Sequence, residues 1–255
     1  MTHFRAGTFS LPLPFLLQIA SGRISMPVDE ETANIACDEL LAAVADKAFP
    51  CLGAKSAMAR GTLKTVVCQS LHSAGDDARI HTELLDWVKG YRQDPTGLRS
   101  LAVIFTGPED LDEQEFEVAL WDRLQSLANI DDRRRQPYDR SVSSDPDDPH
   151  FSLSFGGSAF FVIGLHPNAS RPARRMRHPT LVFNLHEQFE RLREEGRYER
   201  MRERILSRDL ALSGSINPML ARFGETSEAR QYSGRLVGRD WRCPFHDPRT
   251  AHGRR

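Results

Sequence analysis

Cysteine is scarce in this sequence of 255 residues, with four copies at positions 37, 51, 68 and 243. No two of them form a CxxC pair, and their spacing matches neither a structural zinc site nor a disulfide framework. Uninterrupted apolar runs of about 18 residues, which a membrane-spanning helix needs, are also missing. We therefore expect a protein of the reducing cytoplasm that has no membrane partner.

The short motifs of several common enzyme classes are absent as well. The chain contains no GxGxxG, Walker A, HExxH or GxSxG sequence, which argues against dinucleotide-binding, P-loop, zincin and hydrolase functions. A Ser–His–Asp triad can be assembled from distant residues, so it stays open, but no nucleophile elbow supports one. The net charge of -1 argues against a nucleic-acid partner.

The two parts of the chain differ in the sign of their charge. Residues 1–150 contain 15 Lys and Arg against 24 Asp and Glu, whereas residues 151–255 contain 19 against 11. Such an asymmetry commonly reflects complementary surfaces of one globule. The more specific interpretation is that the basic part binds an anion.

The N-terminal residues do not follow the pattern of a folded domain. The apolar stretch at 9–20 is broken by Pro12 and Pro14, and only Arg5 precedes it as a basic residue. A signal peptide and an extension ahead of a start at Met26 both remain open, and we favour the extension because helical periodicity begins just after it. We expect residues 1–28 to be poorly ordered and residues 29–255 to form one domain.

Hydrophobic periodicity and turn residues predict the remaining elements. Helices are expected at 29–48, after Gly53, at 79–93, at 110–130 and at 186–212 with a break near Gly196. Strands are expected at 64–71, at 100–107, in 151–165 on both sides of Gly156–Gly157, and at 180–185. A long loop is expected at about 131–150, and the last forty residues are expected to follow the surface. The pattern predicts an α+β fold, with a mixed, largely antiparallel sheet packed with helices.

The most unusual segment spans residues 164–175 and directly follows an expected strand. His166 stands at the end of that strand, where an imidazole can reach a cofactor or a metal. Arg171, Arg174 and Arg175 can bind carboxylates or phosphates through charge-assisted, bidentate contacts. The alternative is a polar loop whose arginines are solvated.

Two further residues have side chains that can bind a metal. His186 begins an expected helix and is a candidate metal ligand or acid–base group, although most single histidines are structural. Cys51 lies in a PCLG sequence near an expected helix start, where the thiol pKa is lowered and a thiolate can bind iron. The alternative for Cys51 is a small buried side chain.

Four segments, 49–57, 164–175, 181–192 and 229–245, resemble the YqcI/YcgG family and occur in that order. The resemblance extends over about residues 30–247. It implies a haem-dependent N-hydroxylase, because characterised members look like monooxygenases that act on arginine or on arginine-derived guanidines. The implied cofactor is haem b, with O2 as co-substrate, a guanidine or amine as substrate, and a separate electron donor.

The resemblance also suggests which residues hold the haem. His166 is the first choice for the iron ligand because it lies in the most distinctive segment, with His186 and Cys51 as alternatives. Arg171, Arg174 and Arg175 are the candidates to face the two haem propionates. A thiolate ligand favours O–O cleavage, whereas a neutral histidine depends on hydrogen bonds from its surroundings.

The resemblance assigns substrate-binding roles to other residues. Glu187 and Glu228 are the candidates to pair with a substrate guanidinium, and Tyr232 is expected to line the pocket with Arg230 and Gln231. The alternative function is a haem-binding or small-ligand-binding protein without turnover, such as a sensor or a carrier. A homodimer is left open.

Overall fold

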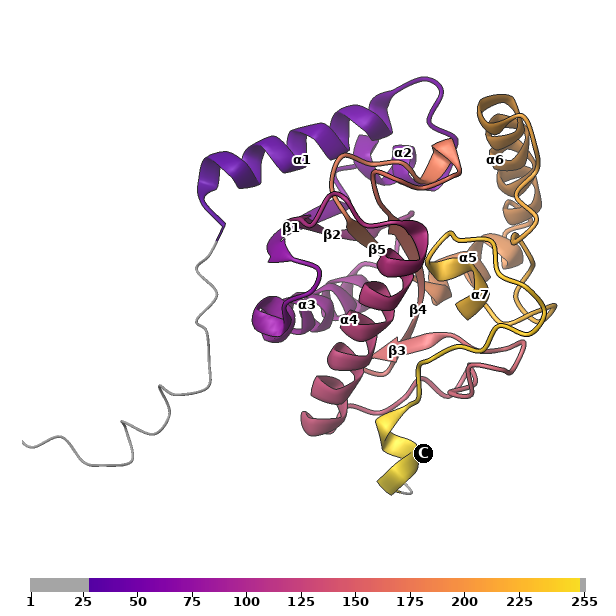
Figure 1. Cartoon of the computed structure of the whole chain (residues 1–255). Coiled ribbons are helices and arrows are strands. Elements are labelled where there is room, and N and C mark those ends of the chain that lie inside the picture. Colours follow the sequence, from indigo (N-terminus) through magenta and orange to yellow (C-terminus); the bar gives the residue numbers. More distant parts are fainter. Residues whose placement is uncertain (1–27, 253–255) are drawn as a thin grey trace, which may run out of the picture.

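A five-stranded sheet forms the centre of the computed structural model, which describes residues 28–252 (Figure 1). The strand order is β1-β2-β5-β4-β3. The strands are β1 (Leu63–Ser70), β2 (Ser100–Gly107), β3 (Leu153–Phe155), β4 (Ser158–Leu165) and β5 (Thr180–Leu185). The extension expected at residues 1–28 lies outside the described residues, apart from its last residue.

Strand directions in this sheet are mixed. β1 and β2 pair in parallel, whereas β2–β5, β5–β4 and β4–β3 are antiparallel. The parallel pair is joined through helix α3 (Asp77–Gln93), as parallel strands need a crossover connection. The predicted α+β fold with a largely antiparallel sheet is confirmed.

The β3–β4 hairpin turns at two glycines. Gly156 and Gly157 have φ values of 60° and 72°. A two-residue turn with both φ angles positive matches the twist of the strands it connects, and glycine adopts it without steric cost. The hairpin predicted from this glycine pair is therefore confirmed.

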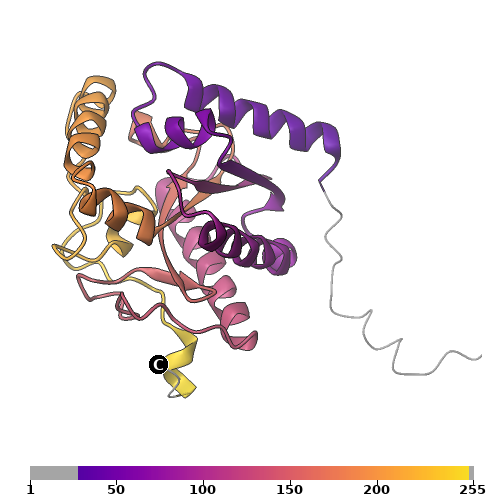
Figure 2. The same ribbon diagram turned by 180° about the vertical axis from the view of Figure 1, so that it is seen from behind.

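Helices cover both faces of the sheet (Figures 1 and 2). Helices α3 and α4 (Glu113–Arg133) pack against one face over the larger hydrophobic core. Helix α1 (Glu30–Ala45) packs against β1 and β2 on the opposite face over a smaller core. Helices α2 (Leu52–Ala59), α5 (His186–Glu194) and α6 (Tyr198–Ser213) complete this second layer.

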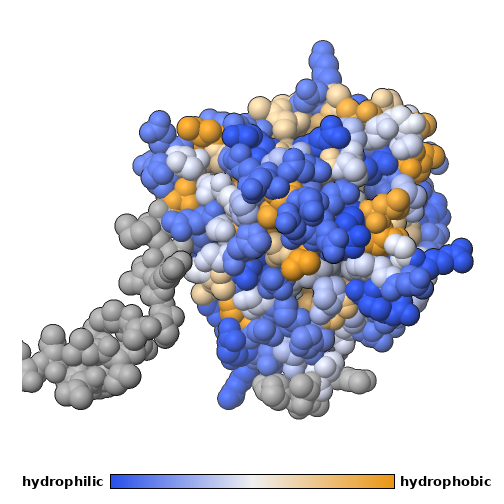
Figure 3. Space-filling view, in the orientation of Figure 1, coloured by the Kyte–Doolittle hydropathy of each residue, from blue (hydrophilic) through white to orange (hydrophobic). Residues whose placement is uncertain are grey.

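The surface has no large continuous apolar area on the face seen in Figure 3, where hydrophobic patches are small and separate. In the described part of the chain, no helix has both the length and the hydropathy required to span a bilayer.

Two expectations from the sequence are corrected by tertiary contacts. Helix α4 runs to Arg133, three residues beyond the helix end expected at 130, and the loop expected at about 131–150 follows it. The reason is Asp131, which is fully buried and accepts hydrogen bonds from the backbone N–H of Gly156 and the guanidinium of Arg249. A polar sequence therefore remains helical because its carboxylate has buried partners.

The C-terminal segment was expected on the surface but contributes to the core. Tyr232, in the short helix α7 (Ala229–Tyr232), is fully buried and stacks on Trp121 with 5.7 Å between ring centroids. Phe245 is also buried and lies 6.3 Å from the same indole ring. Widely spaced aromatic residues anchor this segment, and a search for periodic apolar residues does not detect them.

We expect Gly164→Ala to destabilise the protein by about 1–3 kcal/mol, as overpacking of a core does. A Cβ at Gly164 would lie 2.7 Å from side-chain atoms of Leu120 and Phe116 and 2.9 Å from the Tyr232 carbonyl. Gly90→Ala is the control, because a Cβ inside α3 meets nothing within 4 Å, and it should stabilise by about 1 kcal/mol. Urea unfolding measures the free energy of unfolding of both variants, and equal values for Gly164→Ala and Gly90→Ala would contradict the prediction.

Candidate functional site

An apolar cavity lies on the sheet face that α1, α2, α5 and α6 cover. It encloses about 280 Å³, just below the range of roughly 300–1,000 Å³ for small-ligand sites, and it is partly open to solvent. Its walls are mainly aliphatic and aromatic side chains from the sheet and from these helices, and they include Leu40, Val44, Phe49, Ala102, Phe161, Ile163, Leu165, Val182, Phe189, Ile205, Leu206 and Phe223. A small number of polar groups interrupt this lining, as is typical of ligand sites.

The alternation of side chains along the strands decides which residues reach the cavity. In β4 the odd-numbered residues Phe161, Ile163 and Leu165 line it. In β5 the even-numbered residues Val182 and Asn184 do so, because each β4–β5 pair joins an odd to an even position. His186 follows β5 with the same parity and also lines the cavity.

His186 is the first residue of α5 and is 6% exposed. Its ring packs on Phe223, with 4.4 Å between centroids, and its buried Nε2 atom has no hydrogen-bond partner. The nearest carboxylate oxygen, on Glu190, lies 3.6 Å from Nε2. Burial lowers the pKa of His186 despite the opposing effect of Glu190. A neutral imidazole with a free ring nitrogen is the form that binds metals.

His166 lies on the other face of the sheet. It follows β4 with even parity, so its ring stacks on Phe116 of α4, with 4.3 Å between centroids. Its Nδ1 atom is buried without a hydrogen-bond partner, and burial lowers its pKa. The sheet therefore separates it from the cavity, and the structure does not bring His166 together with Cys51 and His186.

The three arginines of the 164–175 segment have different surroundings. Arg174 is buried and donates to the carbonyls of Gly164 at 2.9 Å and Gln231 at 3.0 Å; burial lowers its pKa to about 10. Arg171 forms a 2.5 Å ion pair with Asp209, and both arginines line the cavity. Arg175 donates to backbone carbonyls outside it. The cavity therefore contains two of the three predicted cations.

Cys51 lines the cavity at the N-cap of α2, where its Sγ accepts from the Ala54 N–H at 3.4 Å. Burial raises the pKa of this thiol, although the nearby charge of Arg174 opposes the shift. The lowered pKa expected from a helix start is therefore corrected. A protonated thiol is a poorer iron ligand than the neutral ring of His186.

Glu228 supplies a buried carboxyl group to the cavity. It is 6% exposed, accepts from the Ser152 hydroxyl at 2.5 Å, and has the Tyr232 hydroxyl 3.4 Å away. Burial raises the pKa of Glu228 to about 7. The group is thus poised between its neutral and ionised forms near neutral pH.

Of the other residues selected for substrate contact, Glu187, Arg230 and Tyr232 lie outside the cavity. Glu187 is exposed and pairs with Arg191 at 3.3 Å, one turn along α5. The Tyr232 hydroxyl lies 3.4 Å from a carboxylate oxygen of Glu228, but Tyr232 does not line the cavity. The guanidinium of Arg230 lies over the Trp241 ring, 5.7 Å from its centroid. Gln231 does line the cavity, as expected. Sequence reasoning missed Phe161 and Asn184, which strand alternation together with the position of His186 could have indicated.

The raised pKa of Glu228 makes stability depend on pH. Its folded pKa of about 7 exceeds the ordinary value of 4.5, so its contribution is complete below pH 4.5 and is lost as pH rises through 7. The difference corresponds to about 3 kcal/mol. Urea unfolding between pH 4.5 and 8 should show this fall, and Glu228→Gln should remove it. An unchanged pH dependence in that variant would contradict the assignment.

A scan against protein-family models matches residues 40–246 to one family, described as the YqcI/YcgG family. The chain belongs to the YqcI/YcgG family. A search of the curated proteins and a search of the solved structures each returned no match. In this YqcI/YcgG protein, the matched range includes every residue that lines the cavity.

Haem is the cofactor that the sequence resemblance implies, and this YqcI/YcgG protein has a suitable donor for it. Among residues 28–252, no group of three or more His, Cys, Asp or Glu side chains is arranged to hold a metal ion. A haem iron needs only one or two protein ligands, since the porphyrin supplies the others. The Nε2 atom of His186, which has no hydrogen-bond partner, and the apolar lining of the cavity fit this requirement.

Proposed function

We propose that this YqcI/YcgG protein is a haem-dependent N-oxygenase that hydroxylates a guanidine or amine nitrogen of arginine or a related small molecule. The observation that carries the proposal is the buried, unpartnered Nε2 of His186 in a cavity that also contains the carboxyl group of Glu228. The Nε2 atom suits haem iron, and the carboxyl group suits a cationic nitrogen group.

In this proposal His186 holds the iron, in place of His166. The apolar walls contact the porphyrin, and Arg171 and Arg174 provide positive charge for the two propionates. Bound haem supplies the binding and activation of O2. The protein contributes the orientation of the bound groups and a mainly apolar lining around them.

Glu228 binds the substrate guanidinium. A planar guanidinium and a carboxylate form two parallel charge-assisted hydrogen bonds, which fix the orientation of the nitrogen to be oxidised. The substrate's positive charge lowers the pKa of Glu228 and keeps it ionised. The Ser152 hydroxyl donates to the same carboxylate and fixes its direction, so Ser152 is a positioning residue.

An absorption spectrum followed by a turnover assay tests the proposal. Protein expressed with a haem precursor should show a Soret band, and adding arginine, O2 and a reductant should yield an N-hydroxylated product. A Soret band without product from any guanidine or amine would favour the haem-binding sensor or carrier. The absence of a Soret band after reconstitution would reject both haem functions.

A further inference from the structure

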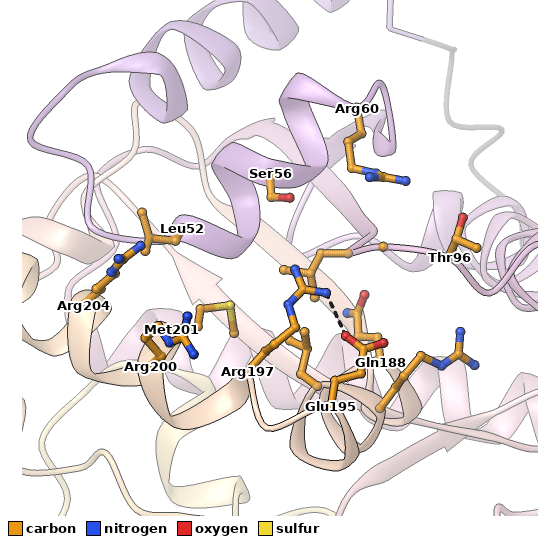
Figure 4. Close-up of a pocket in the computed structure, with 14 residues that line it drawn as sticks. Leu52, Ser56, Arg60, Thr96, Gln188, Glu195, Arg197, Arg200, Met201 and Arg204 are labelled. Atoms are coloured by element: carbon orange, nitrogen blue, oxygen red, sulfur yellow. Dashed lines mark hydrogen bonds and ion pairs between the residues drawn. The ribbon is translucent and has the colours of Figure 1, made fainter.

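A second hollow lies beside the cavity and encloses about 560 Å³. We name it the arginine cleft. Figure 4 shows it between α2, the segment before β2, and the turn that joins α5 to α6. Three residues, Leu98, Gln188 and Met201, line both hollows and form the wall between them.

The charged residues of the arginine cleft are almost all cationic. Five of its lining residues are arginines and one is Glu195; the arginines are Arg60, Arg191, Arg197, Arg200 and Arg204. Arg60 extends from α2, and the last three recur at helical spacing at the start of α6, so they share one side of that helix. Cations are disfavoured in the first turn of a helix, so Arg200 in the first turn of α6 is destabilising unless an anion lies near it.

Three of the five arginines have no partner within the described chain. Arg197 pairs with Glu195 at 2.7 Å, and Arg191 pairs with Glu187 at 3.3 Å. For Arg60, Arg200 and Arg204, the described residues provide neither a hydrogen bond nor an ion pair. Their guanidinium groups are therefore free to bind a ligand.

The backbone makes room for Arg60. Gly97 has a φ of +70°, and a Cβ at this position would lie 2.7 Å from the Nε atom of Arg60. A side chain at position 97 would therefore displace the guanidinium from the edge of the cleft. Because Gly97 has no side chain, Arg60 can lie across the cleft from the arginines of α6 (Figure 4).

We propose that the arginine cleft binds a small molecule that carries two or more negative charges on phosphate or carboxylate groups. Guanidinium groups bind such oxyanions bidentately, and arginines on opposite walls can hold two charged groups at once. The volume of about 560 Å³ lies within the range of small-ligand sites, roughly 300–1,000 Å³. The proposal is independent of haem, because Arg60, Arg200 and Arg204 do not line the cavity.

Isothermal titration calorimetry with pyrophosphate and with citrate tests this proposal, with ionic strength held constant by sodium chloride. Acetate serves as the singly charged comparison. The test variant is Arg200→Ala/Arg204→Ala. The matched control is Arg133→Ala/Arg140→Ala, which removes the same charge from exposed positions that line neither hollow.

The full chain should bind at least one of the two polyanions saturably and acetate far more weakly. The test variant should lose at least about tenfold in affinity, which corresponds to one charge-assisted contact, while the control keeps the wild-type value. The preference between pyrophosphate and citrate identifies the phosphate or the carboxylate ligand. No saturable binding of either, or an equal loss in the test and control variants, would overturn the proposal.

Discussion

His186→Ala should abolish haem binding, whereas His166→Ala should retain it. The Nε2 atom of His186 is buried in the apolar cavity without a hydrogen-bond partner, so binding iron breaks no hydrogen bond and displaces only the 3.6 Å contact with the Glu190 carboxylate. His166 packs on Phe116 on the far side of the sheet, so its removal leaves the cavity walls in place. The Soret band of each purified variant, compared with that of the wild type, measures the difference.

A structural role for His186 has to be separated from iron ligation. His186→Gly with added imidazole serves this purpose, because a free imidazole can enter the vacated space and restore the Soret band if the lost group was the ligand. Circular dichroism confirms that each variant is folded. A variant that lacks His186 and retains an unchanged haem spectrum would contradict the assignment, and Cys51→Ala would then be the next variant to examine.

Glu228→Gln should lower kcat/KM for a guanidine substrate by at least about thirtyfold while the Soret band stays unchanged. Removing one member of a buried, hydrogen-bonded charge pair costs roughly 2–5 kcal/mol, and 1.4 kcal/mol is tenfold. Glutamine retains the shape and the contact with Ser152 but not the negative charge. Glu187→Gln is the matched control, because Glu187 is exposed outside the cavity and should leave kcat/KM unchanged.

The pH profile gives a second readout for Glu228. Its pKa of about 7 in the free protein means that the group is mainly neutral below pH 7 and mainly ionised above it. Because the ionised form binds a guanidinium, kcat/KM should rise with pH through about 7 and then level off. The Glu228→Gln profile should lack this rise. The same rise in the variant would assign it to another group.

Local patterns in the sequence were sufficient for most of the elements. Strands at 100–107 and 180–185, the glycine hairpin and the helix break near Gly196 all occur where they were predicted. Each depends on neighbouring residues, through side-chain alternation, positive φ angles or helical spacing. The position where α4 ends was not predicted, because Asp131 near that end accepts a hydrogen bond from Arg249, a residue 118 positions away.

By itself, the sequence determined the α+β class and the set of residues whose side chains can bind a metal or an anion, because both follow from local pattern and residue type. Only the tertiary structure decided which of those residues meet. The antiparallel register joins odd positions of β4 to even positions of β5, so His166 and His186, both even, lie on opposite faces of the sheet. That register, and the helices that cover each face, depend on packing between distant segments. The same packing brings Arg60 to the arginines of α6 in one cleft.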